Sequence, residues 1–120
     1  MKIFIDDKFD YFEIKLGFKE KIASFHGSFE KVPLSKVKSV SNDIPQKSWK
    51  DMKNPGTDLP GFRAGSFTTL RGHEFWYANL KKESNFLVIE LQDDTYDRII
   101  LTVDNNTELK EKFDRLIEKR

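Results

Sequence analysis

The segment that decides the fold runs from Asn85 to Val103 and reads NFLVIELQDDTYDRIILTV. Its two halves are rich in branched aliphatic residues, which are typical of strands, and the polar group DDTY between them is typical of a turn. The first half is apolar at successive positions, so both faces of this strand are apolar. We therefore expect FLVIEL to be a central strand of a sheet, with DRIILTV returning as a neighbouring strand.

Shorter segments in which apolar and polar residues alternate come before this pair of strands. They predict strands at 11–16, at 29–40 with an interruption at Pro33, at 62–70 and at 74–80. Gly72 supplies the positive φ that a hairpin turn between the last two strands requires.

The segment from Phe18 to Phe25 fits two structures. Phe18, Ile22 and Phe25 recur at helical spacing, whereas Ile22 and Ser24 would also suit a strand. We expect either a short helical turn or an irregular strand here, and the sequence does not decide between them.

The C-terminal segment predicts an amphipathic helix over about 106–119. Asn105 can cap its first turn, with Glu108 three residues later. Its apolar side chains fall in a single stripe, made of Leu109, Phe113, Leu116 and Ile117.

This order of segments predicts one mainly β domain over 1–120, with about seven strands within 1–104 and one helix after them. Short strands in succession favour antiparallel meanders that curl into a sandwich or a barrel. An open end of such a barrel needs a cover, and the apolar stripe of the C-terminal helix can provide it. We expect a seven-stranded antiparallel barrel or sandwich that is capped by this helix.

The composition indicates a small globular domain in a reducing compartment. The 120 residues include no cysteine, which excludes disulfides and thiolate nucleophiles and favours the cytoplasm. The first residues, MKIFIDDKFD, become acidic too early for a signal peptide, and no apolar run is long enough to span a bilayer. The net charge of +1 provides no long-range attraction to nucleic acid or to an anionic membrane.

Residues 42–61 lack a clear period, and we expect them to form a long ordered loop. Two Pro-Gly pairs, at Pro55-Gly56 and Pro60-Gly61, suit the central positions of type II turns. The residues of such a loop either serve only to form turns or also provide a recognition surface. In the second case the binding residues are Trp49, Pro55, Gly56, Thr57 and Leu59, with Leu59 also able to tuck inward.

No catalytic or metal-binding constellation is visible, so we expect a protein that is not an enzyme and that binds no metal or cofactor. His26 and His73 are the only histidines, and neither stands in a nucleophile or zinc motif. A small enzyme with an unrecognised site at either histidine remains an alternative. Glu90 lies in a strongly apolar strand, where, if buried, it needs a partner such as Arg98.

Four segments resemble the pleckstrin-homology-like proteins of bacteria, a family whose members are largely without an assigned function. The segments are EKIASFHG (20–27), VPLSKVKSV (32–40), PGTDLPG (55–61) and IELQDDTYDRIILTVDN (89–105). The resemblance implies a seven-stranded barrel of two sheets that is closed at one end by the final helix. It also implies a binding module, because relatives recognise proteins, peptides and phosphoinositide headgroups.

Headgroup-binding relatives carry basic residues near the turn between their first two strands. Lys15, Lys19 and Lys21 lie near the corresponding place, although the arginine that completes the pattern is missing and Glu20 interrupts the lysines. Binding of an anionic lipid headgroup through these lysines is therefore an alternative function.

The sequence thus predicts a non-enzymatic, cytoplasmic binding or assembly domain. Its expected partner is a protein, a peptide or a second copy of the chain, which could add to an open strand edge. Nucleic acid is not expected, because the three successive aromatic residues in RGHEFWYANLKK alternate between the faces of a strand and suit a core.

Overall fold

The N-terminal part of the chain forms a small antiparallel sheet. The computed structural model describes residues 1–48 and 50–119. This first sheet has the order β1-β2-β3 and is made of β1 (Lys2–Asp6), β2 (Tyr11–Lys15) and β3 (Phe29–Pro33). A seven-residue helix, α1 (Phe18–Ser24), lies between β2 and β3 in the chain, so the helical alternative for this segment is confirmed.

The rest of the chain forms a larger sheet of six strands and a C-terminal helix. A short 3-10 turn, η1 (Leu34–Lys36), leads into it. The strands lie in the order β4-β8-β9-β7-β6-β5. Their bounds are β4 (Val37–Ser41), β5 (Met52–Leu59), β6 (Phe62–Thr69), β7 (Gly72–Asn79), β8 (Phe86–Leu91) and β9 (Arg98–Thr102).

The segment from Asn85 to Val103 provides the middle of this sheet, as predicted. β8 and β9 form an antiparallel pair, and all their residues except Glu90 and Thr102 are buried. β9 also pairs with β7, but in the parallel direction. The expectation of an all-antiparallel sheet is therefore wrong, because β9 returns between β7 and β8 instead of extending the meander.

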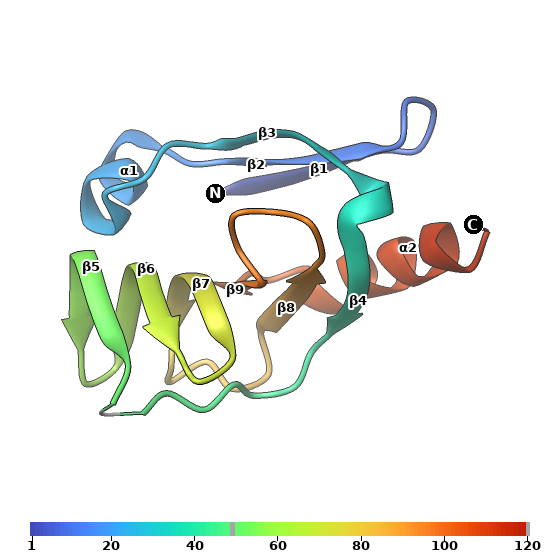
Figure 1. Ribbon diagram of the computed structural model, residues 1–120. Helices are drawn as coiled ribbons and strands as arrows, with labels where there is room; N and C mark the ends of the chain where they lie inside the picture. Colours follow the sequence, from blue (N-terminus) through green and yellow to red (C-terminus); the bar gives the residue numbers. More distant parts are fainter. Residues whose placement is uncertain (49, 120) are drawn as a thin grey trace.

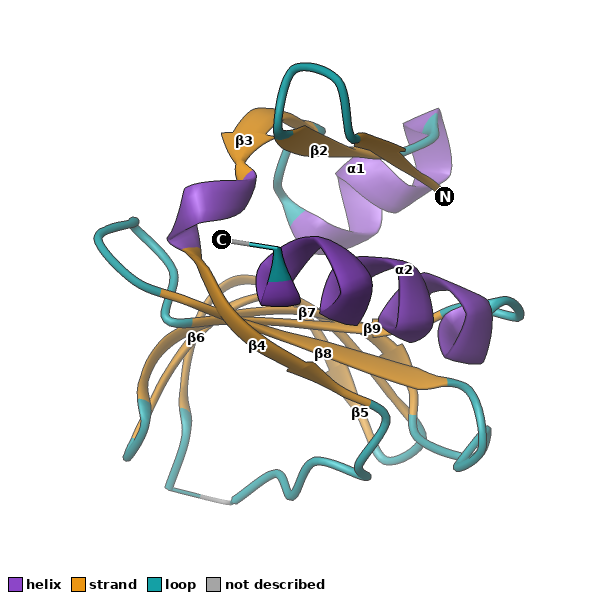
Figure 2. Ribbon diagram, turned by 90° about the vertical axis from the view of Figure 1, so that its right-hand side faces the viewer, coloured by secondary structure: helices purple, strands orange, loops and turns teal. Residues whose placement is uncertain are grey.

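One face of the six-stranded sheet, the inner face, packs against the rest of the domain (Figure 1). The first sheet lies over its middle, α1 lies over β5 and β6, and α2 (Asn106–Glu118) lies over β4 and β8. Figure 2 shows α2 between the two sheets. The core formed here includes Phe12, Ile14, Phe75, Ile89, Leu101 and Phe113, which are all fully buried.

The opposite face, the outer face, carries a second and smaller core. Its members are Phe67, Trp76, Ala78, Phe86, Val88 and Ile100. In the segment 42–51, which joins β4 to β5, residues 42–48 and 50–51 lie along this face and appear below the sheet in Figure 2. Burial of both faces explains why β8 is apolar at successive positions.

The two sheets remain open and do not close into a barrel. The described residues form nine strands instead of about seven, because β1 and β5 lie where no strand is expected. β5 also shortens the expected loop at 42–61 to 42–51. A turn at Pro60-Gly61 is confirmed, since Leu59 pairs with Phe62 across it, but Gly61 lacks the positive φ of the expected type II turn. Pro55-Gly56 forms no turn and lies inside β5 beside an irregularity in register.

The packing of α2 follows the predicted stripe. Phe113 is fully buried and meets Phe12 of the first sheet edge to face, with 5.4 Å between ring centroids. Leu109 is also buried, and Leu116 and Ile117 pack half-buried against the same core. The cap is different, because the Asn105 side chain makes no capping hydrogen bond.

We expect Phe113→Ala to lower the free energy of unfolding by about 3–5 kcal/mol, because it leaves a cavity between the two sheets. Urea unfolding followed by circular dichroism measures this change. Glu111→Ala, on the exposed side of the same helix, is the control and should change the free energy by less than about 0.5 kcal/mol. A loss below about 1 kcal/mol for Phe113→Ala would show that α2 does not fill the core.

Candidate functional site

Helix α1 is too short to be stable alone and is held by contacts at both ends. At its start, Glu20 accepts hydrogen bonds from the Gly17 backbone N–H (2.7 Å) and the Met1 ammonium group (2.9 Å). Near its end, the Thr57 hydroxyl of β5 donates to the Ala23 carbonyl oxygen at 2.9 Å, and Ser24 is fully buried. Small residues therefore face the sheet and bring the helix close to it.

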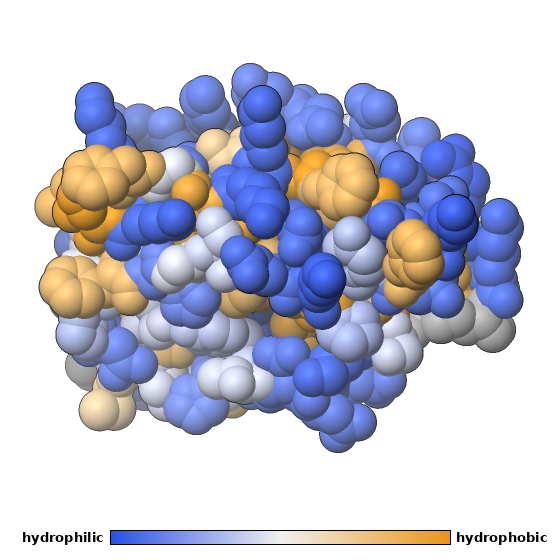
Figure 3. Space-filling model, turned by 90° about the horizontal axis from the view of Figure 1, so that it is seen from above, coloured by the Kyte–Doolittle hydropathy of each residue, from blue (hydrophilic) through white to orange (hydrophobic). Residues whose placement is uncertain are grey.

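The large apolar residues of this segment consequently point outward. Phe18, Ile22 and Phe25 are 79%, 58% and 74% exposed, and we call this group the α1 patch. Apolar side chains gather at the same end of the molecule in Figure 3, on the left. The helical spacing of these three residues was predicted from the sequence, but the periodicity did not indicate which way their face points.

Phe25 stands at the C-terminal end of α1 in the left-handed region, with φ 53° and ψ 39°. This position usually carries glycine, because a side chain there costs about 1 kcal/mol. The mostly exposed ring regains little of this cost by burial. Packing therefore does not account for a phenylalanine at this position.

The charges on α1 are not balanced. Glu20 is occupied by the Met1 ammonium group, whereas Lys19 and Lys21 are exposed and have no ion-pair partner among the described residues. Lys15 lies on β2 and is placed differently, since its ammonium group lies 3.6 Å from Glu13 and 3.9 Å from Glu30. The three predicted lysines thus do not form one open cluster.

The binding residues predicted in the 42–61 loop lie on the edge strand β5, apart from Trp49, which falls outside the described residues. Pro55 and Leu59 are exposed, so the expectation that Leu59 tucks inward is wrong. Gly56 lies against β6, where an added Cβ would come within 2.5 Å of the Ala64 carbonyl oxygen. Thr57 anchors α1. Gly56 and Thr57 therefore support structure at this edge.

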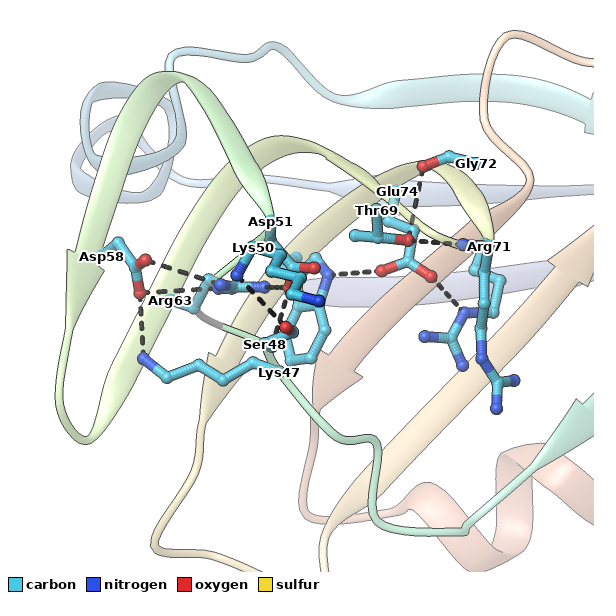
Figure 4. Close-up of polar contacts among 12 residues, drawn as sticks. Lys47, Ser48, Lys50, Asp51, Asp58, Arg63, Thr69, Arg71, Gly72 and Glu74 are labelled. Carbon is cyan, nitrogen blue, oxygen red and sulfur yellow. Dashed lines mark hydrogen bonds and ion pairs between the residues drawn. The ribbon is translucent and has the colours of Figure 1, made fainter.

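An arginine that the sequence analysis did not single out fastens the segment 42–51 to the outer face. The Arg63 side chain is 2% exposed and donates to Asp51 at 2.8 Å and to Asp58 at 3.5 Å (Figure 4). Its guanidinium carbon also lies 4.0 Å from the centroid of the Phe67 ring. The sequence could have indicated this site, because Arg63 lies four positions before Phe67 and therefore on the same face of the strand.

A second buried charge lies on β7. Both carboxylate oxygens of Glu74 are used, one by the Trp76 indole N–H at 3.0 Å and the other by Nε of Arg98. Arg98 is therefore the ion-pair partner of Glu74, and the ion pair with Glu90 that was expected in case of burial of Glu90 does not form. Glu90 is half-buried and accepts a hydrogen bond from the Ser39 hydroxyl at 2.9 Å.

Neither histidine lies in a catalytic arrangement within the described part of the chain. The His26 ring stacks on Phe29 with 4.6 Å between centroids, and its Nδ1 lies 2.5 Å from the Gly27 carbonyl oxygen. His73 is exposed, and its Nδ1 lies 3.4 Å from the Thr68 hydroxyl. Neither ring has a carboxylate partner there.

The described residues contain no group of three or more histidine, aspartate or glutamate side chains placed to hold a metal ion. Neither of their α-helices has the length and apolar character that a bilayer crossing requires. Comparisons with protein-family models, with curated proteins and with solved structures gave no match. The interpretation of the site therefore rests on its own geometry.

The hydrogen bonds of Asp58 make the stability of the domain depend on pH. Burial alone raises the pKa of Asp58, but hydrogen bonds and charges from Lys47 and Arg63 outweigh burial and lower it below its ordinary value. The folded carboxyl group is thus more acidic than the unfolded one. Its contribution to the free energy of unfolding is complete above the pKa of the unfolded carboxyl group, about 4, and is lost as the pH falls through the lower pKa of the folded state.

The free energy of unfolding of the wild type should decrease as the pH falls below about 5. We expect this decrease to be smaller in Asp58→Asn, as measured by urea unfolding at several pH values. Asp43→Asn is the matched control, because Asp43 is exposed and forms no ion pair among the described residues. Equal acid slopes in the wild type and in Asp58→Asn would contradict the proposed role of these hydrogen bonds.

Proposed function

We propose that this chain is a non-enzymatic binding domain that docks a short acidic and apolar peptide segment of another protein onto the α1 patch. The observation that carries the proposal is the exposure of Phe18, Ile22 and Phe25 on one helical face. Aromatic residues are enriched in the cores of protein interfaces, and exposed apolar clusters often mark binding sites.

The backbone of Phe25 supports the same conclusion. An aromatic residue in the left-handed region costs free energy that glycine would not cost. Residues in sparsely populated conformations often lie at functional sites. A ring that is exposed and conformationally costly fits a residue that makes its contacts with a partner.

The size and charge of the patch indicate the kind of partner. Together the three side chains expose roughly 400 Å² of apolar surface, which suits a short segment better than a large obligate interface. Lys19 and Lys21 flank these residues in the sequence. A segment with acidic residues beside its apolar anchors would complement this charge.

Two other occupants fit less well. In a two-fold contact with a second copy, the same lysines would approach one another across the axis, at an electrostatic cost. An anionic membrane would satisfy Lys19 and Lys21, but Lys15, the third residue of the headgroup pattern, lies beside two carboxylates. We therefore favour the acidic peptide.

The relationship to bacterial pleckstrin-homology-like proteins stays a prediction. Two sheets with a packed C-terminal helix agree with it, whereas the parallel pairing of β7 with β9 and the open sheets weigh against it. The cytoplasmic location also stays a prediction. The proposed binding function depends on neither.

To test the proposal, we would select 12-residue peptides from a random display library on the wild-type protein. The same selection would use the triple variant Phe18→Ser/Ile22→Ser/Phe25→Gly. We expect the wild type alone to enrich peptides that combine acidic and large apolar residues. One such synthetic peptide should shift the α1 amide resonances and bind at least tenfold more weakly to Phe25→Gly.

Leu70→Ser is the control, because Leu70 is 92% exposed but lies in the turn between β6 and β7. Phe25→Gly should fold with an unchanged or slightly higher free energy of unfolding, since glycine adopts the left-handed conformation without steric cost. Failure to enrich such peptides would overturn the proposal. Dimerisation that depends on the patch, measured by light scattering, would show that its occupant is a second copy of the chain. Binding to phosphatidylserine vesicles that depends on the patch would show that its occupant is a membrane.

A further inference from the structure

A cleft on the outer face of the six-stranded sheet lies apart from the α1 patch. Its volume is about 340 Å³, and its walls come from β4, β8, β9, the segment 42–51 and the turn between β6 and β7. Its lining includes two acidic and two basic side chains, namely Asp43, Glu90, Arg71 and Arg98. A hollow of about 320 Å³ shares Arg71, Glu90 and Arg98 with it. These volumes fit a small molecule.

Arg98 is held in place from behind. Its side chain is 10% exposed, and its Nε donates to the buried carboxylate of Glu74, which the Trp76 indole also binds. Within residues 1–48 and 50–119, this is the whole set of hydrogen bonds and ion pairs of the guanidinium group. Both terminal amino groups therefore remain available to the cleft, in the planar arrangement that binds a carboxylate with two hydrogen bonds.

Arg71 supplies a second guanidinium group to the same cleft. It is exposed, and its side chain forms no hydrogen bond or ion pair with the described residues. In Figure 4 no dashed line reaches the guanidinium group of Arg71. Two positive groups facing one cavity favour an anion between them.

The acidic residues of the cleft restrict the choice of anion. Glu90 pairs in register with Arg98 on the neighbouring strand, so their side chains leave the same sheet face next to each other. Its carboxylate accepts a hydrogen bond from the neutral Ser39 hydroxyl, and Asp43 also lines the cleft. A doubly charged phosphate would meet both acids, whereas a molecule that carries one charge of each sign would complement all four groups.

We propose that this cleft binds a small zwitterion of the α-amino acid class. Arg98 and Arg71 bind its carboxylate, and Glu90 accepts hydrogen bonds from its ammonium group. Glu74 and Trp76 are positioning residues, because they fix the orientation of Arg98 without reaching the ligand. This site lies on the opposite sheet face from α1, so it is independent of the proposed peptide surface.

The test is a titration of the intact chain with L-alanine, propionate, propylamine and inorganic phosphate, followed through the Nε–Hε resonance of Arg98 by NMR. We expect alanine to shift this resonance in a saturable manner and to bind at least tenfold more tightly than propionate or propylamine. Tighter binding of phosphate than of alanine would contradict a zwitterionic ligand and indicate a simple anion instead. No saturable shift with any probe would overturn the site itself.

Surface variants separate the two ends of the ligand without disturbing the buried pair. Arg71→Ala should weaken the binding of alanine at least tenfold. Glu90→Gln should weaken the binding of alanine and leave the binding of propionate unchanged. Arg115→Ala, an exposed arginine on α2, is the matched control and should alter neither. Equal alanine binding in Arg71→Ala, Glu90→Gln and the wild type would contradict the proposal.

Discussion

The architecture depends on the buried guanidinium group of Arg63. It lies over the rings of Phe67 and Trp76 and binds Asp51, whose side chain is only 5% exposed. A buried ion pair adds little net stability, but removal of one partner leaves the other charge buried at a cost of about 3–5 kcal/mol. The pair therefore fixes the end of this segment at Asp51 against the outer face, and residues 43–46 of the segment form one wall of the cleft.

Much of the fold could be predicted because periodicity reports burial. The apolar pair β8–β9, the hairpin at Gly72 and the stripe on α2 all follow from it. Strand order does not, because β9 has the same pattern whether it lies beside β7 or outside β8. β5 was missed since Met52–Leu59 is an edge strand with a proline and little buried surface, so its sequence resembles that of a loop.

The candidate sites were harder to predict than the fold. The spacing of Phe18, Ile22 and Phe25 indicated a helical face, but the same pattern would serve a buried helix. This face is exposed because Ala23 and Ser24 on the other side of the helix pack against β5 and β6. Such packing depends on the tertiary structure and does not follow from the periodicity of the sequence. Glu90 was noticed because it interrupts an apolar run, whereas Glu74 stands at the start of such a run and was not recognised as a buried charge. Register alone decides that Glu74 faces Arg98.

Accessibility of Trp76 tests most directly whether the segment 42–51 covers the outer face. Trp49→Phe leaves Trp76 as the only indole, which is fully buried beside Arg63. Iodide quenching of its fluorescence should be weak in this background and should rise strongly after Asp51→Ala, with the far-UV circular dichroism retained. Strong quenching while Asp51 is present, or unchanged quenching after its removal from a folded chain, would contradict the account.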